Sequence, residues 1–255
     1  MYSFYLHKNL NKSNNMPISK NDLKKISSLK NKTNRTKLGC FVVEGIKNCK
    51  ELINSDFKVI AIYITENELL NSFPNATLIS EKEANRITHL KSSSSILAVV
   101  EIPKKTPINK ESKTILYLDS IKDPGNLGTI IRTLDWYGHS QLFCSLETVD
   151  QFNSKVIMAS MGSIFRIKVH YIDLNYLQRI FPNHITYGTY LEGENIYNKI
   201  INKKSIIVMG NESHGISKTT TQLIKNKISI PKIGKAESLN VSTAAAIILS
   251  EISRN

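Results

Sequence analysis

The second half of the chain alternates short apolar runs with segments long enough to form helices, and this alternation restricts its fold more than any other feature. The apolar runs are TILYLD, QLFCSL, FRIKVHYI, HITYGTY, SIIVMG and KISIP. Strands separated by helices favour parallel pairing, with helices covering both faces of the sheet. We therefore predict an α/β domain over residues 114–255, built on a mostly parallel sheet flanked by helices.

The first half predicts a second, smaller α/β domain over residues 16–102. Residues 18–37 space their apolar side chains at near-helical intervals between lysines, which predicts one basic amphipathic helix. CFVVEGIKNCKELI then predicts strand, turn and helix, and VIAIYIT and SILAVVEI predict short strands. Residues 103–113 contain two prolines and several lysines without hydrophobic periodicity, so we expect a linker there. The polar, Asn-rich residues 1–15 are expected to be a disordered extension.

The net charge is unevenly distributed. The 34 basic and 21 acidic residues give +13, and the first fifty residues contribute +9, from eleven Lys/Arg against Asp22 and Glu44. Such a local excess favours a polyanionic partner such as RNA. The alternative is a solvated face in a protein from a Lys- and Asn-rich proteome.

The remaining composition excludes several classes of protein. Cys40, Cys49 and Cys144 are widely spaced without a CxxC pair, so we expect reduced thiols that fill the core of an intracellular protein. The histidines form no metal-binding motif, so no metal site is expected. The chain starts without a signal-peptide pattern, and no apolar run approaches the ~20 residues that span a bilayer. We therefore expect a soluble, cytoplasmic protein.

Three predicted strands end in chemically unusual segments. These segments are LDSIKDPGNLGTIIRTLDWYG, IIVMGNESHGIS and ISIPKIGKAESLNVS. Ligands of parallel sheets bind at the carboxyl ends of strands, where glycines allow close backbone approach and helix N-termini favour anions. Taken singly, each segment also fits a structural role: a turn, a solvated Arg132, or a helix N-cap at Ser238 or Asn240. None matches a GxxxxGK phosphate loop or a GxGxxG dinucleotide motif.

The segment KAESLNVSTAAAIILSE, residues 235–251, crowds short polar groups at a helix start. The following residues predict a helix that buries a stripe formed by Val241, Ala245, Ile248 and Ile252. The alanines at 244–246 allow close packing of this helix. The pattern alone leaves open whether the short polar groups cap this helix or belong to a site.

Together, and in this order, NLGTIIR, GNESHGIS and IPKIGKAESLNVSTAAAIILSE resemble the three signature motifs of the SpoU, or TrmH-type, RNA 2′-O-ribose methyltransferases of the SPOUT superfamily. The resemblance spans residues 115–253. In addition, FVVEGIKNCKEL and SSSSILAVVE resemble the family's N-terminal substrate-binding domain, which is similar to a small ribosomal protein.

The resemblance implies a methyltransferase that transfers a methyl group from S-adenosylmethionine to a ribose 2′-hydroxyl of RNA without a metal. It also implies a homodimer and a C-terminal trefoil knot, which physical reasoning alone would not predict because knots are so rare. The separate N-terminal domain favours ribosomal RNA as substrate. The alternatives are a transfer RNA 2′-O-methyltransferase, or a non-catalytic RNA-binding protein that has retained the fold.

The resemblance also assigns roles to individual residues. It implies that five residues contact the cofactor: Thr189, Leu191, Gly210, Ile230 and Leu239. It implies that five others belong to the catalytic site: Asn126, Arg132, Glu212, Ser238 and Asn240.

The expected chemistry divides the work among these catalytic positions. A guanidinium is a poor base, so we expect Arg132 to hold phosphate or ribose and to stabilise developing alkoxide charge, in its own subunit or across a dimer. Asn240 and Ser238 are expected to orient the hydroxyl, and Glu212 to anchor either loops or Arg132. The identity of the general base stays open.

Overall fold

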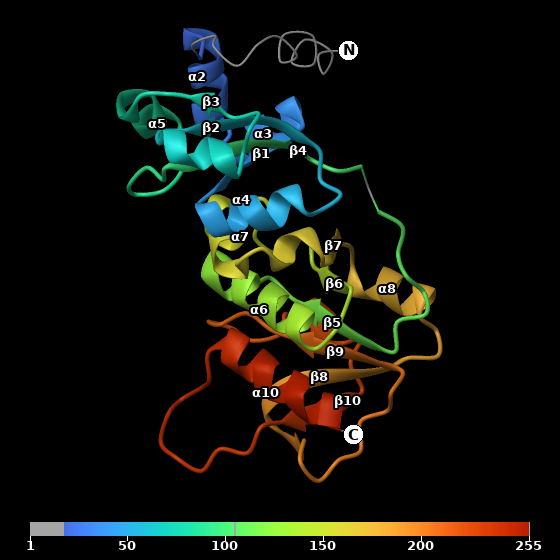
Figure 1. Ribbon diagram of the computed structural model, residues 1–255. Helices are drawn as coiled ribbons and strands as arrows, with labels where there is room; N and C mark the ends of the chain where they lie inside the picture. Colours follow the sequence, from blue (N-terminus) through green and yellow to red (C-terminus); the bar gives the residue numbers. More distant parts are fainter. Residues whose placement is uncertain (1–17, 105, 255) are drawn as a thin grey trace. The chain divides into compact units, whose positions relative to one another are not determined.

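The computed structural model describes residues 18–104 and 106–254, which form two compact units (Figure 1). The smaller unit contains the described residues up to 104 together with Phe152–Phe165, and the larger unit contains the remainder. The expected disordered extension at residues 1–15 lies outside the described residues.

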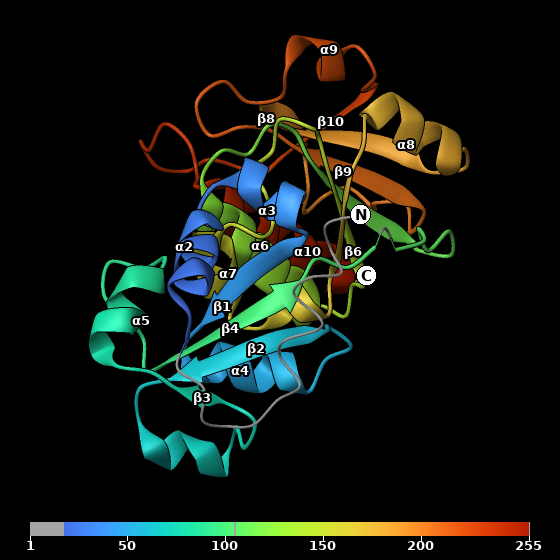
Figure 2. The same cartoon turned by 90° about the horizontal axis from the view of Figure 1, so that it is seen from above.

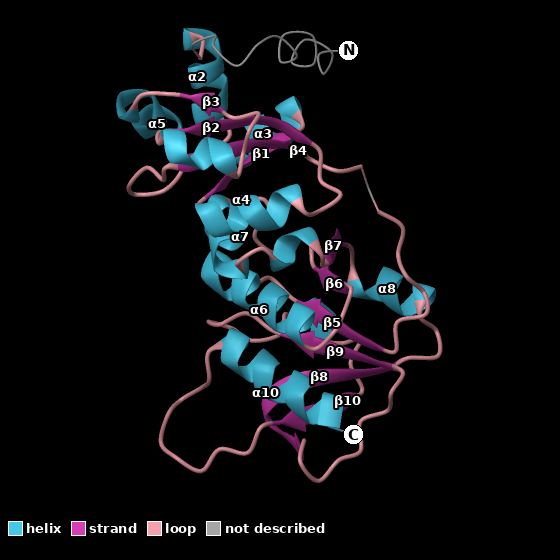
Figure 3. Ribbon diagram, viewed as in Figure 1, coloured by secondary structure: helices cyan, strands magenta, loops and turns pink. Residues whose placement is uncertain are grey.

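The larger unit is built on a six-stranded sheet with the order β10-β8-β9-β5-β6-β7 (Figure 3). Every strand pairing in this sheet is parallel, as predicted, so all its carboxyl ends lie at one edge. Each of the six predicted runs overlaps one strand, although β8 continues beyond its run to Asn195 and β10 begins one residue before its run, at Asn226. The strands are β5 (Thr114–Leu118), β6 (Gln141–Cys144), β7 (Lys168–Tyr171), β8 (Ile185–Asn195), β9 (Ser205–Met209) and β10 (Asn226–Ser229).

Helices cover both faces of this sheet. On one face α6 (Pro124–Trp136) and α10 (Val241–Arg254) lie side by side (Figure 1). The opposite face packs against α8 (Leu174–Ile180), whose leucines join a buried cluster with Tyr117 and Phe143 (Figure 2). A short helix, α9 (Lys218–Thr221), follows β9. The predicted two-sided coverage is therefore confirmed.

Most of the stripe predicted for α10 is buried. Val241, Ala245 and Ile248 are buried, whereas Ile252 is only half-buried, and Leu249 takes a fully buried place instead. The helix thus buries a slightly rotated face, and it packs beside α6.

The smaller unit has a four-stranded sheet with the order β1-β4-β2-β3. The predicted turn after the first strand is present, because Gly45 adopts a φ of 91° between β1 and α4. The short β3 and the helix α5, whose start is fixed by a capping box at Ser80 and Glu83, were not predicted. The elements are β1 (Cys40–Glu44), α4 (Ile46–Ile53), β2 (Val59–Ile64), η1 (Asn67–Asn71), β3 (Thr77–Leu78), α5 (Glu81–Ile87) and β4 (Ile96–Glu101).

The single amphipathic helix predicted at residues 18–37 is wrong: two helices are present, α2 (Lys20–Ser28) and α3 (Lys32–Leu38). The break has a local cause. Asn31 takes an extended backbone conformation and its side chain accepts a hydrogen bond from Thr33 N at 2.8 Å, which starts a new helix. The apolar side chains of α2 still face the core of this unit, as the spacing indicated.

The chain between β6 and β7 packs with the smaller unit. It forms α7 (Ser154–Ser160) and η2 (Ser163–Phe165). The ring of Phe152 stacks on Phe41 with centroids 4.4 Å apart, and Phe165 meets Phe57 edge-on at 5.3 Å. A truncation that removed the first 105 residues would therefore expose these aromatic rings to water.

The three cysteines are free thiols buried in the cores of the two units, as predicted. Burial raises the pKa of Cys40 to about 11 and that of Cys49 to about 12, and it also raises the pKa of Cys144. These thiols are therefore protonated and unreactive at neutral pH. Within residues 18–104 and 106–254, no helix is both long and apolar enough to span a membrane.

Candidate active site

A cavity of about 870 Å³ opens at the carboxyl ends of β8, β9 and β10. Its volume lies in the range of sites for small molecules and cofactors. Its wall is formed by residues 189–192 of β8, the turn after β9, and the long exposed loop between β10 and α10. Figure 1 shows the backbone of this loop leading into α10. The five residues predicted to contact the cofactor all line it: Thr189, Leu191, Gly210, Ile230 and Leu239.

The wall contributed by β8 is a bulge. β10 pairs with β8 at Gly188 and next at Glu194, so residues 189–193 have no partner in the ladder. At Gly193 an added Cβ would lie 2.9 Å from the backbone carbon of Ile228, so only glycine allows the two strands to close again after the bulge. This local geometry brings Thr189 and Leu191 to the cavity.

The turn after β9 is equally tight. Asn211 and Gly215 exchange two backbone hydrogen bonds of 2.9 Å, which fold the turn back on itself. A Cβ at Gly210 would lie 2.2 Å from the backbone of Gly215 and Ile216. Glycine is therefore required at this position because the turn's own backbone passes over it.

The cavity wall fits an adenosyl group. Leu191, Ile233 and Leu239 are 70%, 99% and 49% exposed although they line a concave surface, so apolar area is available to a planar base. Carboxylates and lysines at the same wall, including Glu192 and Lys232, provide polar partners for a ribose or an amino acid moiety. This combination matches the adenosine and methionine halves of S-adenosylmethionine.

The described residues contain no cluster of three or more His, Cys, Asp or Glu side chains that could hold a metal ion. The lining of the cavity consists instead of hydrogen-bonding side chains, apolar groups and backbone.

Three of the predicted catalytic residues form a hydrogen-bonded chain beside this cavity. Asn126 Nδ2 donates to Glu212 Oε1 at 2.7 Å, and Asn240 Nδ2 donates to Asn126 Oδ1 at 2.9 Å. Each residue comes from a different sequence motif: the start of α6, the turn after β9 and the start of α10. Residues up to 114 positions apart in the sequence thus meet at one point.

Asn240 also caps a helix. Its Oδ1 accepts hydrogen bonds from Ser242 N at 2.8 Å and from Ser242 Oγ at 2.6 Å, at the start of α10. The interpretation of this residue as a helix cap is therefore confirmed, and its catalytic role stays a prediction. The cap fixes the carboxamide so that its nitrogen points to Asn126.

The other two predicted catalytic residues lie apart from this chain. Ser238 is exposed on the loop before α10 and lines the cavity. Arg132 is exposed on α6, and its side chain makes no hydrogen bond or ion pair with the described part of the chain. Arg132 is six positions after Asn126, which places it about 120° around the helix and roughly 9 Å along its axis.

The sequence comparisons agree with this arrangement. The family model described as the SpoU rRNA Methylase family matches residues 113–250 of the 255-residue chain. The chain belongs to this SpoU family. A second model, described as an MRM3-like substrate binding domain, matches residues 20–100. The resemblance that the motifs carry is confirmed.

Individual relatives extend the likeness over both units. The 23S rRNA (guanosine(2553)-2′-O)-methyltransferase RlmP of Bacillus subtilis is 30% identical over 228 residues, which cover 87% of this chain and 91% of the relative. Among solved structures, a putative RNA methyltransferase of the TrmH family from Porphyromonas gingivalis has a TM-score of 0.82 at 29% identity, covering 94% and 99% of the two chains. The AdoMet-bound rRNA methyltransferase from Sinorhizobium meliloti has a TM-score of 0.80 at 28% identity, covering 94% and 97%. The trefoil knot implied by the resemblance stays a prediction.

In this SpoU protein, two further residues hold the loops around the candidate site, and the sequence motifs gave them no role. Asp119, directly after β5, is buried and accepts a hydrogen bond from Ser217 N at 2.8 Å. Asn211 is buried beside Glu212 and donates to Ser120 O at 2.6 Å. Only their places in the sequence could have indicated a role: Asp119 follows a predicted strand, and Asn211 lies within the motif GNESHGIS.

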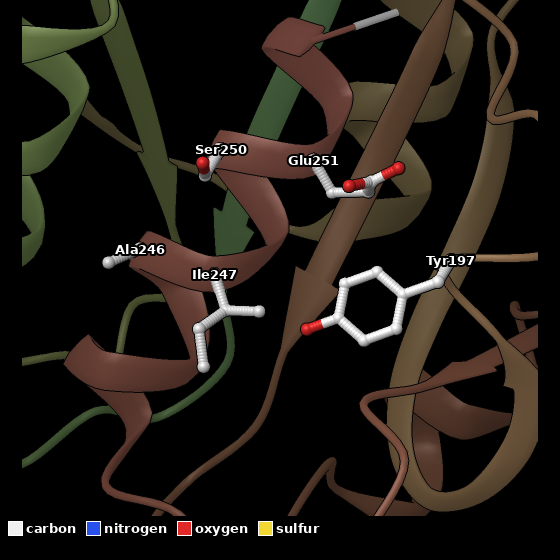
Figure 4. A pocket seen from close by; sticks show the side chains of 5 residues that line it. All are labelled: Tyr197, Ala246, Ile247, Ser250 and Glu251. Atoms are coloured by element: carbon white, nitrogen blue, oxygen red, sulfur yellow. The ribbon is translucent and has the colours of Figure 1, made fainter.

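A second, smaller hollow of about 380 Å³ lies along α10. Figure 4 shows the ring of Tyr197 facing Ile247 and Glu251 across it, and Ala246 and Ser250 complete its lining. None of the predicted site residues lines this hollow, so it is separate from the candidate active site.

Proposed function

We propose that this chain transfers a methyl group from S-adenosylmethionine to a ribose 2′-hydroxyl of ribosomal RNA. The observation that carries the proposal is a cavity lined by two of the three sequence motifs, GNESHGIS and IPKIGKAESLNVSTAAAIILSE. The third motif, NLGTIIR, joins them beside the cavity through the hydrogen-bonded chain Glu212–Asn126–Asn240. The name of the relative RlmP, a 23S rRNA 2′-O-methyltransferase, supports ribosomal RNA as the substrate. With such a substrate, the protein is expected to act in the cytoplasm.

The cofactor supplies a methyl group that its positive sulfur has already activated for displacement. The protein must therefore align the ribose oxygen with the methyl carbon and stabilise the charge that develops on that oxygen. Asn240 Nδ2 has two hydrogens and gives one to Asn126, so the other remains for the ribose oxygen. Ser238, on the cavity wall, provides a second hydroxyl partner.

The three-residue chain has a further consequence for Glu212. Its carboxylate accepts from Asn126 and so holds the turn after β9 against the start of α6. Of the two roles predicted for Glu212, anchoring a loop is the one that these contacts support. Arg132, whose charged group is free on the surface of α6, is then available to RNA or to a second subunit.

The substrate test compares RNA classes directly. Labelled methyl from S-adenosylmethionine should appear in ribosomal RNA and not in transfer RNA. Transfer to transfer RNA alone would favour the alternative enzyme, and RNA binding without transfer to either would favour a non-catalytic RNA-binding protein.

Two substitutions of Asn240 should separate its role in the site from its role as a helix cap. Asn240→Ala removes both, so methyl transfer should fall at least tenfold and the protein should lose about 1 kcal/mol of stability. Asn240→Asp keeps the capping oxygen but places a second oxygen, in place of the amide donor, against Asn126 Oδ1. Transfer should therefore fall equally, while the contribution of the cap to stability is retained. Single-turnover rates and thermal unfolding measure the two effects. Full activity of Asn240→Asp would contradict the proposed role.

The exposed lysines of α2 and α3 should bind the RNA backbone. Replacing Lys20, Lys24, Lys32 and Lys37 by glutamine should weaken RNA binding and make it less sensitive to salt. The log–log slope of affinity against salt should fall by roughly 0.7 to 0.9 for each phosphate that the variant no longer neutralises. The affinity for S-adenosylmethionine should not change.

A control with the same change in charge uses lysines at the amino ends of β5 and β9, far from the site along the strands. Lys110, Lys113, Lys203 and Lys204 are all exposed there. Binding measured over a salt series should be close to wild type for this control. If the two quadruple variants lost RNA affinity equally, the net charge of the protein, and not the position of the lysines, would determine RNA binding.

We further propose a homodimer that uses the outer face of α6. Arg132 and Trp136 are one turn apart and both exposed, and Trp136, the only tryptophan of the chain, is 85% exposed. An exposed tryptophan of this kind is typical of an interface. Sedimentation at micromolar concentration should give about twice the 28.8 kDa chain mass, and dilution should shift the tryptophan emission to the red. A fully active monomer would rule this out.

A further inference from the structure

Asn211 connects two of the loops that build the candidate active site. Its side chain is about nine-tenths buried, and both of its functional atoms are used. Nδ2 donates to the backbone oxygen of Ser120 at 2.6 Å, and Oδ1 accepts from the backbone nitrogen of Ser213 at 2.8 Å. One carboxamide thus holds the loop before α6 and the turn after β9.

The loop that Asn211 holds is conformationally strained. Ser120 has a φ of 61°, in the left-handed region that costs a non-glycine residue roughly 1 kcal/mol or more. Its backbone nitrogen donates to Ser145 Oγ at 2.9 Å, and its carbonyl is the group that Asn211 binds. Such a conformation persists only where neighbouring groups hold it in place.

The same two loops carry Asn126 and Glu212. Glu212 follows Asn211 directly in the turn, and Asn126 lies at the start of the helix that follows the strained loop. The 2.7 Å hydrogen bond between these two side chains requires both loops to be in place.

We propose that Asn211 is a positioning residue for methyl transfer, which acts by holding Glu212 in contact with Asn126. This inference rests on the proposed function for its activity readout. Asn211 itself does not reach the reacting groups, because its polar atoms are engaged with backbone.

The test variant is Asn211→Asp, which keeps the shape and the acceptor for Ser213 N but places an oxygen against the carbonyl of Ser120. The single-turnover rate at saturating cofactor and RNA should fall at least tenfold. The dissociation constant for S-adenosylmethionine should change by less than about threefold, because the two backbone hydrogen bonds between Asn211 and Gly215 still close the turn that forms this part of the cavity wall. Without any cofactor, hydrogen exchange should increase in residues 119–127 and 210–217.

A matched control is Asn226→Asp on β10. Asn226 Nδ2 also donates to a backbone carbonyl, that of Thr186 at 3.2 Å, but it takes no part in the loops of the site. This variant should lose some stability and keep the wild-type transfer rate.

A double-mutant cycle with Glu212→Gln separates positioning from general destabilisation. If Asn211 acts through Glu212, the double variant should be no slower than the slower single variant. If the rate reductions of the two single variants multiplied in the double variant, the proposal would be overturned. A folded Asn211→Asp protein with the wild-type transfer rate would also overturn it. If Asn211→Asp does not fold, Asn211→Ser, which retains a short acceptor, takes its place in the cycle. Failure of the wild-type protein to transfer methyl would instead contradict the proposed function, and the exchange measurement would still test the link between the loops.

Discussion

Replacing Gly210 by alanine is expected to raise the dissociation constant for S-adenosylmethionine at least hundredfold, about 2.7 kcal/mol of binding free energy. A Cβ at this position would lie 2.2 Å from the backbone of Gly215 and Ile216, so the turn after β9 must open. That turn forms one wall of the cavity. Gly210→Val should have an equal effect, because the first added carbon already causes the clash.

Calorimetric titration of the folded variants with S-adenosylmethionine measures this effect. Gly39→Ala provides the control: Gly39 has a φ of 64° and no neighbour within 4 Å, so the variant is strained in the smaller unit without touching the cavity. It should lose roughly 1 kcal/mol of stability and bind the cofactor normally. A much weaker effect of alanine than of valine at Gly210 would mean that the side chain meets the ligand and not the turn.

Replacing Arg132 by alanine should slow methyl transfer by roughly 100- to 1,000-fold, the range found when a group that stabilises developing negative charge is removed. The change should leave the stability within about 0.5 kcal/mol, because the side chain is exposed and unpaired in the described part of the chain. We therefore expect a large fall in the transfer rate with almost no change in the stability of the subunit. Single-turnover transfer at saturating RNA and cofactor, together with thermal unfolding, measures both.

Mixing two inactive proteins tests where Arg132 acts. If it acts across a dimer, subunits carrying Arg132→Ala and subunits carrying Gly210→Ala should form mixed dimers in which one site has both an intact cavity and an intact arginine. Activity should then return on mixing. If it acts within its own subunit, the mixture should remain inactive.

The sequence predicted the larger unit well because its signals are local and repeated. Six apolar runs each became a strand, and parallel pairing followed from their spacing. The smaller unit was less predictable, since a single capping residue, Asn31, divides what hydrophobic spacing indicated to be one helix. The packing of Phe152–Phe165 with the smaller unit depends on contacts with Phe41 and Phe57, which local patterns cannot reveal.

The sequence predicted which residues form the candidate site, but not the hydrogen bonds between them. Two motifs, GNESHGIS and IPKIGKAESLNVSTAAAIILSE, contain much of the cavity lining, and parallel strands explain why they meet there with the residues of β8. The hydrogen bonds of Asn126 with Glu212 and Asn240 depend on side-chain orientation, which local sequence patterns do not reveal. The hydrogen bonds of Asn211 to Ser120 and Ser213 were not predicted, because no sequence pattern distinguishes a buried amide next to a carboxylate.

The position of the transferred methyl group tests the central claim most directly. Ribosomal RNA methylated with labelled S-adenosylmethionine is hydrolysed in alkali, which cleaves every linkage whose 2′-hydroxyl is free. We predict that the label from the wild-type protein appears in a single alkali-resistant dinucleotide, and that Arg132→Ala and Asn240→Asp yield little of it. Label recovered in a mononucleotide, and hence on a base, would contradict the account.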